Sequence, residues 1–172
     1  IEIQGYDFVK SHAEKPTLAQ MSGLQTSDIA NHGYFINSGT TQFLVELTNR
    51  QALSNLQVDL VKLRQVNADS PLKNVDEPSV YYWYQDDNSI HSRMFFEQNK
   101  ILVEDSGTGS ACANLGAYFI LTKQFPTQKH IYQGDDMGRP NRLTLKVDDK
   151  QNIFVGGHVI EVGKGEFYLP SI

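Results

Sequence analysis

The residues best suited to chemistry in this sequence gather in the stretch VEDSGTGSACANLGAYFILTK, residues 103–123. Glu104 and Asp105 stand directly before a Ser-Gly-Thr-Gly-Ser loop, and no charged side chain follows until Lys123. If a helix begins in this loop, its first N–H groups have no partner inside the helix. Glycine lets a ligand approach the backbone, hydroxyl groups donate hydrogen bonds, and the helix dipole favours negative charge. The pattern therefore predicts the floor of a pocket for a small anion such as a carboxylate. The predicted binding residues are Gly107, Thr108, Gly109 and Ser110.

The same residues also fit a structure that binds nothing. A polar cap and a tight turn over a core helix would satisfy the N–H groups without any ligand. The roles of the two carboxylates are undecided in the same way. Glu104 or Asp105 can cap the helix, or can orient a substrate amine and help to move a proton. Residue types and spacing do not separate these roles.

Several better-known catalytic motifs do not match this region. Residues 107–112 are not a dinucleotide-binding fingerprint, because Cys112 stands where the last Gly or Ala belongs. They are not a phosphate-binding P-loop, since no Gly-Lys-Ser/Thr follows. A Ser-His-Asp triad on Ser110 would need a base that the sequence does not place. The 5 histidines show no metal-ligand spacing, so no metal site is expected.

Two further residues have a structural and a functional interpretation. Cys112 is the only cysteine, which excludes an intramolecular disulfide and permits a cytoplasmic location. Its place inside the uncharged run predicts a buried core residue rather than a nucleophile. Arg139 lies in the turn-rich segment QGDDMGRP and is a candidate partner for a carboxylate. In the simpler interpretation it pairs with Asp135 or Asp136.

The uncharged run itself predicts a helix over residues 108–123. It has almost no polar stripe at any helical angle, and a helix that is apolar all round is buried on all sides. Small residues would let strands approach closely, and Lys123 and Pro126 mark the end of the helix. The small residues are Ala111, Ala113, Gly116 and Ala117.

The elements around this helix are mostly strands. Apolar and polar residues alternate at 34–36 and 41–47, and two strand-like runs flank an Asp-Asp-Asn turn between 80 and 96. Helical spacing occurs at 18–24 and at 50–65, the latter as one helix or two short ones. After the central helix, five strand-like runs follow: HIYQG, LTLKV, IFVGG, HVIEVG and EFYLP. The sequence therefore predicts an α+β fold in which strands curl around one buried helix.

Length and composition favour a single globular domain. The 172 residues are 40% hydrophobic and 20% charged. The net charge of −5 does not indicate the positively charged surface that binding to the phosphate backbone of nucleic acid requires. No apolar stretch reaches the roughly 20 residues that a membrane helix needs, so a soluble protein is expected. Because the chain begins at Ile1, we expect either a processed start or one piece of a longer polypeptide.

Four ordered motifs resemble a known family. They are SRMFF (92–96), EDSGTGSACANLGAYF (104–119), QGDDMGRPNRL (133–143) and VGGHVIEVGKGEFYLP (155–170). In this order they resemble the C-terminal half of the PhzF-like phenazine biosynthesis family, which shares the diaminopimelate epimerase fold. The resemblance implies that residues 1–172 are one domain of a two-domain protein whose N-terminal domain is absent from the chain. It also implies two similar halves, each a curled sheet around a central helix, with the active site between them.

The family resemblance implies a specific chemistry. Better-known members isomerise trans-2,3-dihydro-3-hydroxyanthranilate by moving a proton with a carboxylate, without metal or organic cofactor. Asp105 matches the substrate-contacting Asp, and Gly109 and Ser110 match the loop that holds the substrate carboxylate. The family's catalytic Glu lies in the absent half, so no residue of this chain takes that role. Because residues 106–109 lack the catalytic Cys of the epimerases, a two-thiol racemase is not expected.

Three functions follow from the resemblance and from the missing half. The first is the C-terminal domain of a PhzF-like isomerase, with a small carboxylate as substrate, the N-terminal half as partner and a homodimer as the assembly. The second is a non-catalytic, small-anion-binding or degenerate domain, inactive without its N-terminal half. The third is pairing of two copies across the open face, which would imitate a whole protomer.

Overall fold

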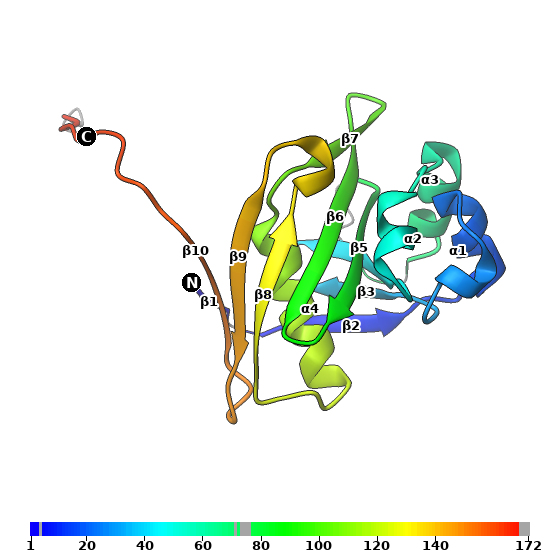
Figure 1. Ribbon diagram of the computed structural model, residues 1–172, viewed down its shortest axis with the longest axis horizontal. Helices are drawn as coiled ribbons and strands as arrows, with labels where there is room; N and C mark the ends of the chain where they lie inside the picture. The colour runs from blue at the N-terminus through cyan, green and yellow to red at the C-terminus, as the bar shows by residue number, and fades with distance from the viewer. Residues whose placement is uncertain (4, 71, 73–76, 169–172) are drawn as a thin grey trace.

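The computed structural model describes residues 1–3, 5–70, 72 and 77–168. Its strands form a mixed sheet that curls around helix α4, Gly109–Leu121 (Figure 1). Ten strands of these residues form the sheet, in the order β1-β10-β9-β8-β6-β5-β4-β3-β2, and β7 pairs with β6 beside this path. The pairs β4–β5 and β6–β8 are parallel, whereas the other pairs are antiparallel. The predicted α+β fold with one central helix is confirmed.

The strands are β1 (Glu2–Ile3), β2 (Asp7–Lys10), β3 (Tyr34–Asn37), β4 (Thr41–Glu46), β5 (Ser79–Asp86), β6 (Ser89–Gln98), β7 (Ile101–Asp105), β8 (Thr127–Gln133), β9 (Asn141–Val147) and β10 (Ile153–Gly157). The other helices are α1 (Lys15–Ser22), α2 (Arg50–Ser54) and α3 (Leu60–Ala68), with short 3₁₀ turns η1 (Thr26–Asp28) and η2 (Asp135–Met137). No helix of the described residues is long and apolar enough to cross a membrane.

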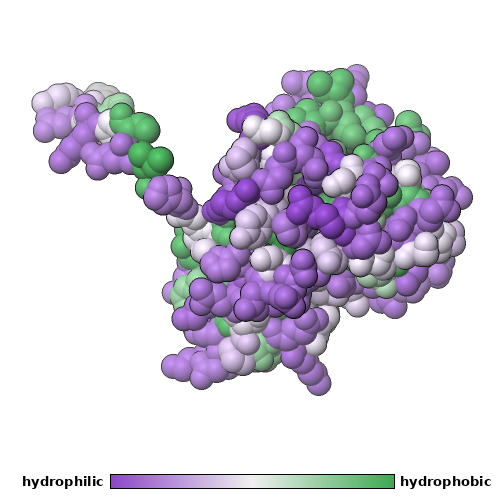
Figure 2. Space-filling view, in the orientation of Figure 1, coloured by the Kyte–Doolittle hydropathy of each residue, from purple (hydrophilic) through white to green (hydrophobic). Residues whose placement is uncertain are grey.

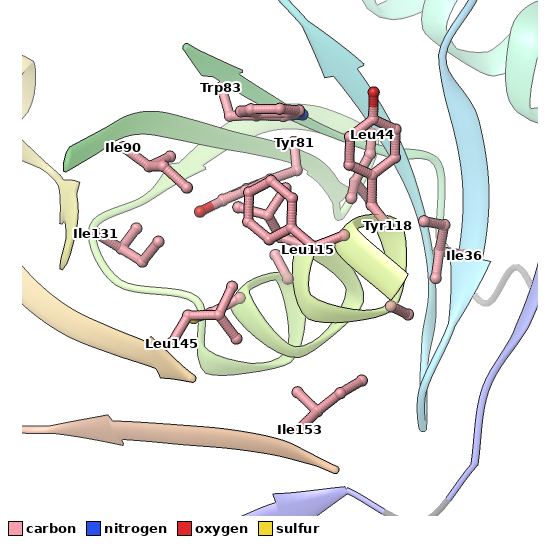
Figure 3. Packing of buried hydrophobic residues seen from close by; sticks show 14 of the residues in the cluster. Ile36, Leu44, Tyr81, Trp83, Ile90, Leu115, Tyr118, Ile131, Leu145 and Ile153 are labelled. Atoms are coloured by element: carbon pink, nitrogen blue, oxygen red, sulfur yellow. The ribbon is translucent and has the colours of Figure 1, made fainter. Parts of the chain in front are cut away.

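Helix α4 lies in the first of two cores, enclosed by the concave face of the sheet (Figure 3). Its residues 111–120 are all buried, as expected for a helix without a polar stripe. Leu115 fills the space between strands, whereas Gly116 allows close approach. A Cβ on Gly116 would lie 2.6 Å from Ile153 Cγ2 and 3.1 Å from Leu145 Cδ1. The predicted role of the small residues is confirmed at this position.

A second core covers the opposite face of the sheet and is not predicted by the sequence pattern. Helices α1, α2 and α3 pack there against β3 to β6 (Figure 1). Alternation along β5 places Tyr81 and Trp83 toward α4 but Tyr82 toward these helices. The central strands are therefore apolar on both faces, as in sheets that are covered on both sides. Side-chain caps at Asn49 and Asp59 begin α2 and α3, so the predicted helical region at 50–65 forms two helices.

Two parts of the chain differ from the sequence prediction. Residues 101–105, for which the sequence analysis predicts no strand, form strand β7, because Leu102 and Val103 pair with Glu97 and Phe96 of β6. The runs HVIEVG and EFYLP are not strands: residues 158–168 have no regular structure, while Leu169 and Pro170 lie outside the described residues. Strand pairing needs a neighbouring strand edge, and the tail leaves the sheet after β10 (Figure 1).

The far end of α4 contacts a half-buried carboxylate, Glu46, at the edge of the first core. Glu46 Oε2 accepts hydrogen bonds from Tyr118 Oη at 3.0 Å and Asn31 Nδ2 at 2.8 Å. Burial raises the pKa of Glu46 above its ordinary value of 4.5, and the two hydrogen bonds lower it only in part. The folded protein therefore binds this proton more tightly than the unfolded chain.

We expect the stability contribution of Glu46 to be fully present at acidic pH and to be lost as pH rises through its raised pKa. Glu46→Gln keeps an acceptor for both donors but cannot ionise. Its urea midpoint should therefore exceed that of the wild type at pH 8 and approach it near pH 4. A wild-type advantage that grows with pH would contradict this assignment.

Candidate active site

Strand β7 and the start of α4 place the predicted loop at one end of the first core. Asp105 ends β7 opposite Met94 of β6, and α4 begins only four residues later. Thr108 stands at the N-cap position in an extended conformation, but its hydroxyl does not cap the helix. The loop is therefore short and held between a strand and a helix that are both packed into the sheet.

The Asp105 side chain organises this loop from within. Thr108 Oγ1 donates to Asp105 Oδ2 at 2.7 Å, and Gly107 N–H donates to Oδ1 at 3.3 Å. The Gly107 N–H thus already has an acceptor, which leaves it less suited to hold a ligand than the prediction supposed. These bonds orient the half-buried Asp105 carboxylate.

Gln133, at the end of β8, is a supporting residue that the sequence analysis missed. It is fully buried, and its Oε1 accepts from Thr108 N–H at 3.1 Å. Its Nε2 donates to Asp105 O at 2.8 Å and to Thr108 Oγ1 at 2.9 Å. One feature of the sequence could have indicated Gln133: it is a polar residue two positions after the apolar Ile131, on the buried face of the strand and just before the Gly-Asp-Asp turn. Gln133 fixes both ends of the Asp105–Thr108 turn.

The turn after Gln133 passes directly beneath the loop. Gly134 has φ +80°, and a Cβ there would lie 2.2 Å from Arg139 O and 2.7 Å from Ser106 O. Only glycine fits this close approach in the left-handed region. The QGDDMGRP segment therefore supports the loop through its backbone, which explains why it is dense in turn residues.

The free donors of the site are at the start of α4. Thr108 N–H is taken by Gln133, and Cys112 N–H bonds Thr108 O at 3.1 Å. Among the described residues, the N–H groups of Gly109 and Ser110 have no acceptor, as expected for the first turn of a helix. These two residues are exposed, so an anion can reach them.

Two pockets flank this helix start. The first, of about 420 Å³, brings Asp105 and Thr108 together, and the second, of about 330 Å³, is next to Gly109 and Ser110. The first is lined by Thr40, Thr41, Gln42, Glu77, Ser79, Met94, Phe96, Asp105 and Thr108. The second is lined by Ile1, Ile3, Ser38, Gly39, Thr40, Gly109, Ser110, Ala113 and Val155. Thr40 borders both, and Gly107 borders neither.

The neighbouring carboxylate has a structural role. Glu104 points away from the first pocket and makes a bidentate pair with Arg93, with both N···O distances 2.8 Å. This pair raises the pKa of the Arg93 guanidinium, mainly through the hydrogen bonds to Glu104. Glu104 therefore holds β7 to β6, while Asp105 on the alternate face remains at the pocket.

The remaining sequence candidates are settled by their surroundings. Cys112 is fully buried, and burial raises the pKa of its thiol to about 12, so it is a core residue as predicted. The simpler interpretation of Arg139 is wrong, because among the described residues its side chain pairs with neither Asp135 nor Asp136, and Arg142 pairs with Asp135 at 2.7 Å. Arg139 is exposed and contributes its backbone. Among the described residues, no three His, Cys, Asp or Glu side chains gather as a metal site would require.

The sequence and fold match known proteins over nearly the whole chain. A family model for phenazine biosynthesis-like proteins (PhzC-PhzF) matches residues 7–165. An uncharacterized isomerase of Pasteurella multocida (strain Pm70) is 42% identical over 156 residues, which are 91% of this chain and 51% of that protein. This chain therefore spans about half the length of the curated relative that it matches.

Two solved structures show the same fold at lower identity. A phenazine biosynthesis protein of the PhzF family from Bacillus anthracis has a TM-score of 0.72 at 20% identity, over 91% of this chain and 56% of its own. A predicted epimerase from Pseudomonas aeruginosa has a TM-score of 0.69 at 23% identity, over 98% of this chain and 58% of its own. The curled sheet around one helix is thus the fold of these proteins, and by its sequence this chain belongs to the phenazine biosynthesis-like (PhzC-PhzF) family.

Proposed function

We propose that this chain forms one wall of the active site of a PhzF-type isomerase, as the C-terminal half of that enzyme. The observation that carries the proposal is the placement of Asp105 at a pocket beside the free N–H groups that begin α4. A carboxylate side chain at one pocket, and unpaired N–H groups of a helix start at the neighbouring pocket, suit a substrate that carries its own carboxylate and loses a proton nearby.

The substrate carboxylate would bind at the start of α4. The N–H groups of Gly109 and Ser110 point out of the first turn and have no acceptor among the described residues. The positive end of the α4 dipole adds to their attraction for an anion. Thr108 supports this arrangement indirectly, because its N–H and hydroxyl are used by Gln133 and Asp105.

Asp105 would act at the atoms next to that carboxylate. In a proton-shift isomerisation, a base removes a proton from one carbon and an acid returns one to another, so the substrate changes neither charge nor composition. Asp105 would orient a substrate amine or hydroxyl and assist the transfer, while the main base comes from the other half of the enzyme. We expect the reaction to need neither a metal nor an organic cofactor.

The partner of this wall would be the other half of the enzyme, since the chain spans 51% of its Pasteurella relative. Apolar residues gather on the tail after β10, where Figure 2 shows hydrophobic atoms far from the body. Val159, Val162 and Phe167 are 87%, 97% and 95% exposed, which is costly in water. We propose that the other half covers them.

A homodimer of this chain is the alternative assembly. Sedimentation of the 172-residue chain at high concentration distinguishes a monomer from a dimer by mass.

Binding can be tested on this chain alone by NMR. We expect anthranilate to shift the backbone amide resonances of Gly109 and Ser110, whereas aniline, which lacks the carboxylate, should leave them unchanged. Gly107, whose N–H is already accepted by Asp105, should respond less. Equal responses to both probes, or none, would overturn the carboxylate site.

Catalysis can be tested in a chimera. This chain would be joined to the part of the Pasteurella relative that it does not match, and solvent deuterium in the product would be measured with trans-2,3-dihydro-3-hydroxyanthranilate as substrate. We expect incorporation to survive dialysis against a chelator. A chimera that binds anthranilate but never incorporates deuterium from this or related acids would favour the second candidate, a non-catalytic anion-binding domain.

A further inference from the structure

A buried amide network connects the β3–β4 turn to the start of α4. Asn114, one helical turn after Ser110, is fully buried, and both ends of its side-chain amide are in use. Its Oδ1 accepts from Ser38 N–H at 2.8 Å and from Ser38 Oγ at 2.6 Å. Its Nδ2 donates to Thr40 O at 3.1 Å and to Gln42 Oε1 at 2.8 Å. All four hydrogen-bonding positions of the amide are therefore satisfied.

The direction of these bonds is fixed by the backbone. A backbone N–H only donates and a carbonyl only accepts, so Ser38 N–H identifies Asn114 Oδ1 and Thr40 O identifies Nδ2. Gln42 Oε1 must then be the acceptor of the second Nδ2 hydrogen. This leaves Gln42 Nε2 to face Ser110 Oγ, which it reaches at 3.0 Å.

The chain of donors ends at the Ser110 hydroxyl. Because Ser110 Oγ accepts from Gln42 Nε2, its own hydrogen is not used in that bond and remains available for another acceptor. Ser110 is exposed and lines the 330 Å³ pocket. Within the part of the chain that the structure describes, the Gln42 bond is the one that Ser110 Oγ makes, and it is an accepted bond.

We infer that Asn114 is a positioning residue which, through Gln42, turns the Ser110 hydroxyl into a hydrogen-bond donor toward the bound carboxylate. The inference rests on the proposed carboxylate site. It explains why a helix that is otherwise apolar carries one fully buried amide, and it assigns roles to Gln42 and Asn114 that the sequence motifs did not suggest. The site would favour ligands that present an acceptor, such as a carboxylate, over an ammonium group.

Asn114→Asp reverses the network with almost no change of shape. The introduced carboxylate can still accept from Ser38, but its second oxygen now faces Thr40 O and Gln42 Oε1. The Gln42 amide must turn so that its Nε2 donates to this carboxylate. That turn brings Gln42 Oε1 to Ser110, and the Ser110 hydroxyl then donates inward. Gln42→Glu produces the same reversal from a second position.

A double-mutant cycle with anthranilate as the probe tests this reversal. In the wild-type background, Ser110→Ala should weaken binding about tenfold or more, because a hydrogen bond to a charged group is lost. In the Asn114→Asp or Gln42→Glu background, the same Ser110→Ala change should have no further effect. The added negative charge acts equally on both members of each pair, so it cancels within the cycle.

The control is Tyr118→Phe, which removes two partly buried hydrogen bonds near the opposite end of α4. In that background Ser110→Ala should cost as much as in the wild type. An equal cost of Ser110→Ala in every background would overturn the positioning role of Asn114.

A ligand-free measurement separates this inference from the proposed function. In the NMR spectrum of the free chain, the Gln42 Nε2 hydrogens should show nuclear Overhauser contacts to the Ser110 β-hydrogens. Contacts to Asn114 instead would mean the opposite amide orientation and would overturn the inference. If the expected contacts are seen but no variant or wild type binds anthranilate, the carboxylate site fails, and with it the role assigned to Ser110.

Discussion

Asp105→Asn is expected to lower the turnover of the chimeric isomerase by about 10²–10⁴-fold, the usual range for losing a group that assists proton transfer. Asparagine has nearly the same shape, and its oxygen can still accept the shorter of the two bonds, from Thr108 Oγ1 at 2.7 Å. Only the longer bond from Gly107 N–H, at 3.3 Å, is lost, so the loop should largely keep its conformation. What is lost is the carboxylate that, in the proposed function, orients the substrate and assists the proton transfer. The measurement is solvent deuterium incorporation, with anthranilate binding followed in parallel.

The matched control for this change is the neighbouring residue. Glu104→Gln removes a carboxylate one position away that faces Arg93 rather than the pocket. We expect it to reduce stability but to change turnover by no more than a few fold at a temperature where the variant is folded. Equal losses for the two variants would mean that Asp105 acts through the structure of the loop and not on the substrate.

Gly116→Val is expected to reduce the free energy of unfolding by about 3 kcal/mol, the upper part of the range for overpacking a core. The first side-chain carbon would lie 2.6 Å from Ile153 Cγ2, and a β-branched residue such as Ile153 has little freedom to move away. Two further methyl groups would push α4 away from β9 and β10. Urea unfolding at constant slope measures the loss.

Alanine substitutions at two glycines of α4 provide the comparison. A Cβ on Gly109 has no heavy atom within 4 Å, whereas one on Gly116 meets Ile153 and Leu145. Alanine is intrinsically better than glycine in a helix by about 1 kcal/mol. Gly109→Ala should therefore be neutral or stabilising and Gly116→Ala destabilising. An unchanged urea midpoint for Gly116→Val would contradict this prediction, because the strands around α4 would then move apart at little cost in free energy.

The first core was predictable because its signal is local. A run without charge from residue 106 to 122 predicts a helix buried on all sides after the loop, and its small residues anticipate the close contact of Gly116 with Ile153. The strands at 34–36 and 41–47 followed from alternation, and those at 80–96 from the turn residues between two strand-like runs. The second core was missed because one strand, β5, supplies both faces, and alternation of apolar with apolar residues shows no period.

In the tail, by contrast, the sequence predicted strands that its described residues do not form. Its runs have the composition of strands, but a strand exists only when another edge pairs with it, and residues 158–168 pair with none of the described strands. The interpretation that Arg139 pairs with Asp135 or Asp136 was wrong for a related reason. Two residues of one turn segment, Arg139 and Arg142, compete for the same acids, and only the path of the backbone selects Arg142 for Asp135.

The sequence by itself determined the central helix, the carboxylate before it and the hydroxyl- and glycine-rich loop between them, since neighbours in the chain remain neighbours in space. Tertiary structure decided which donors of that loop are free. Gln133, 25 residues beyond Thr108, takes one N–H, and Asn114 and Gln42 orient the hydroxyl of Ser110 from a different strand and helix turn. Hydrogen-bond partners that are distant in sequence leave no pattern in it, because any polar residue at those positions would look the same.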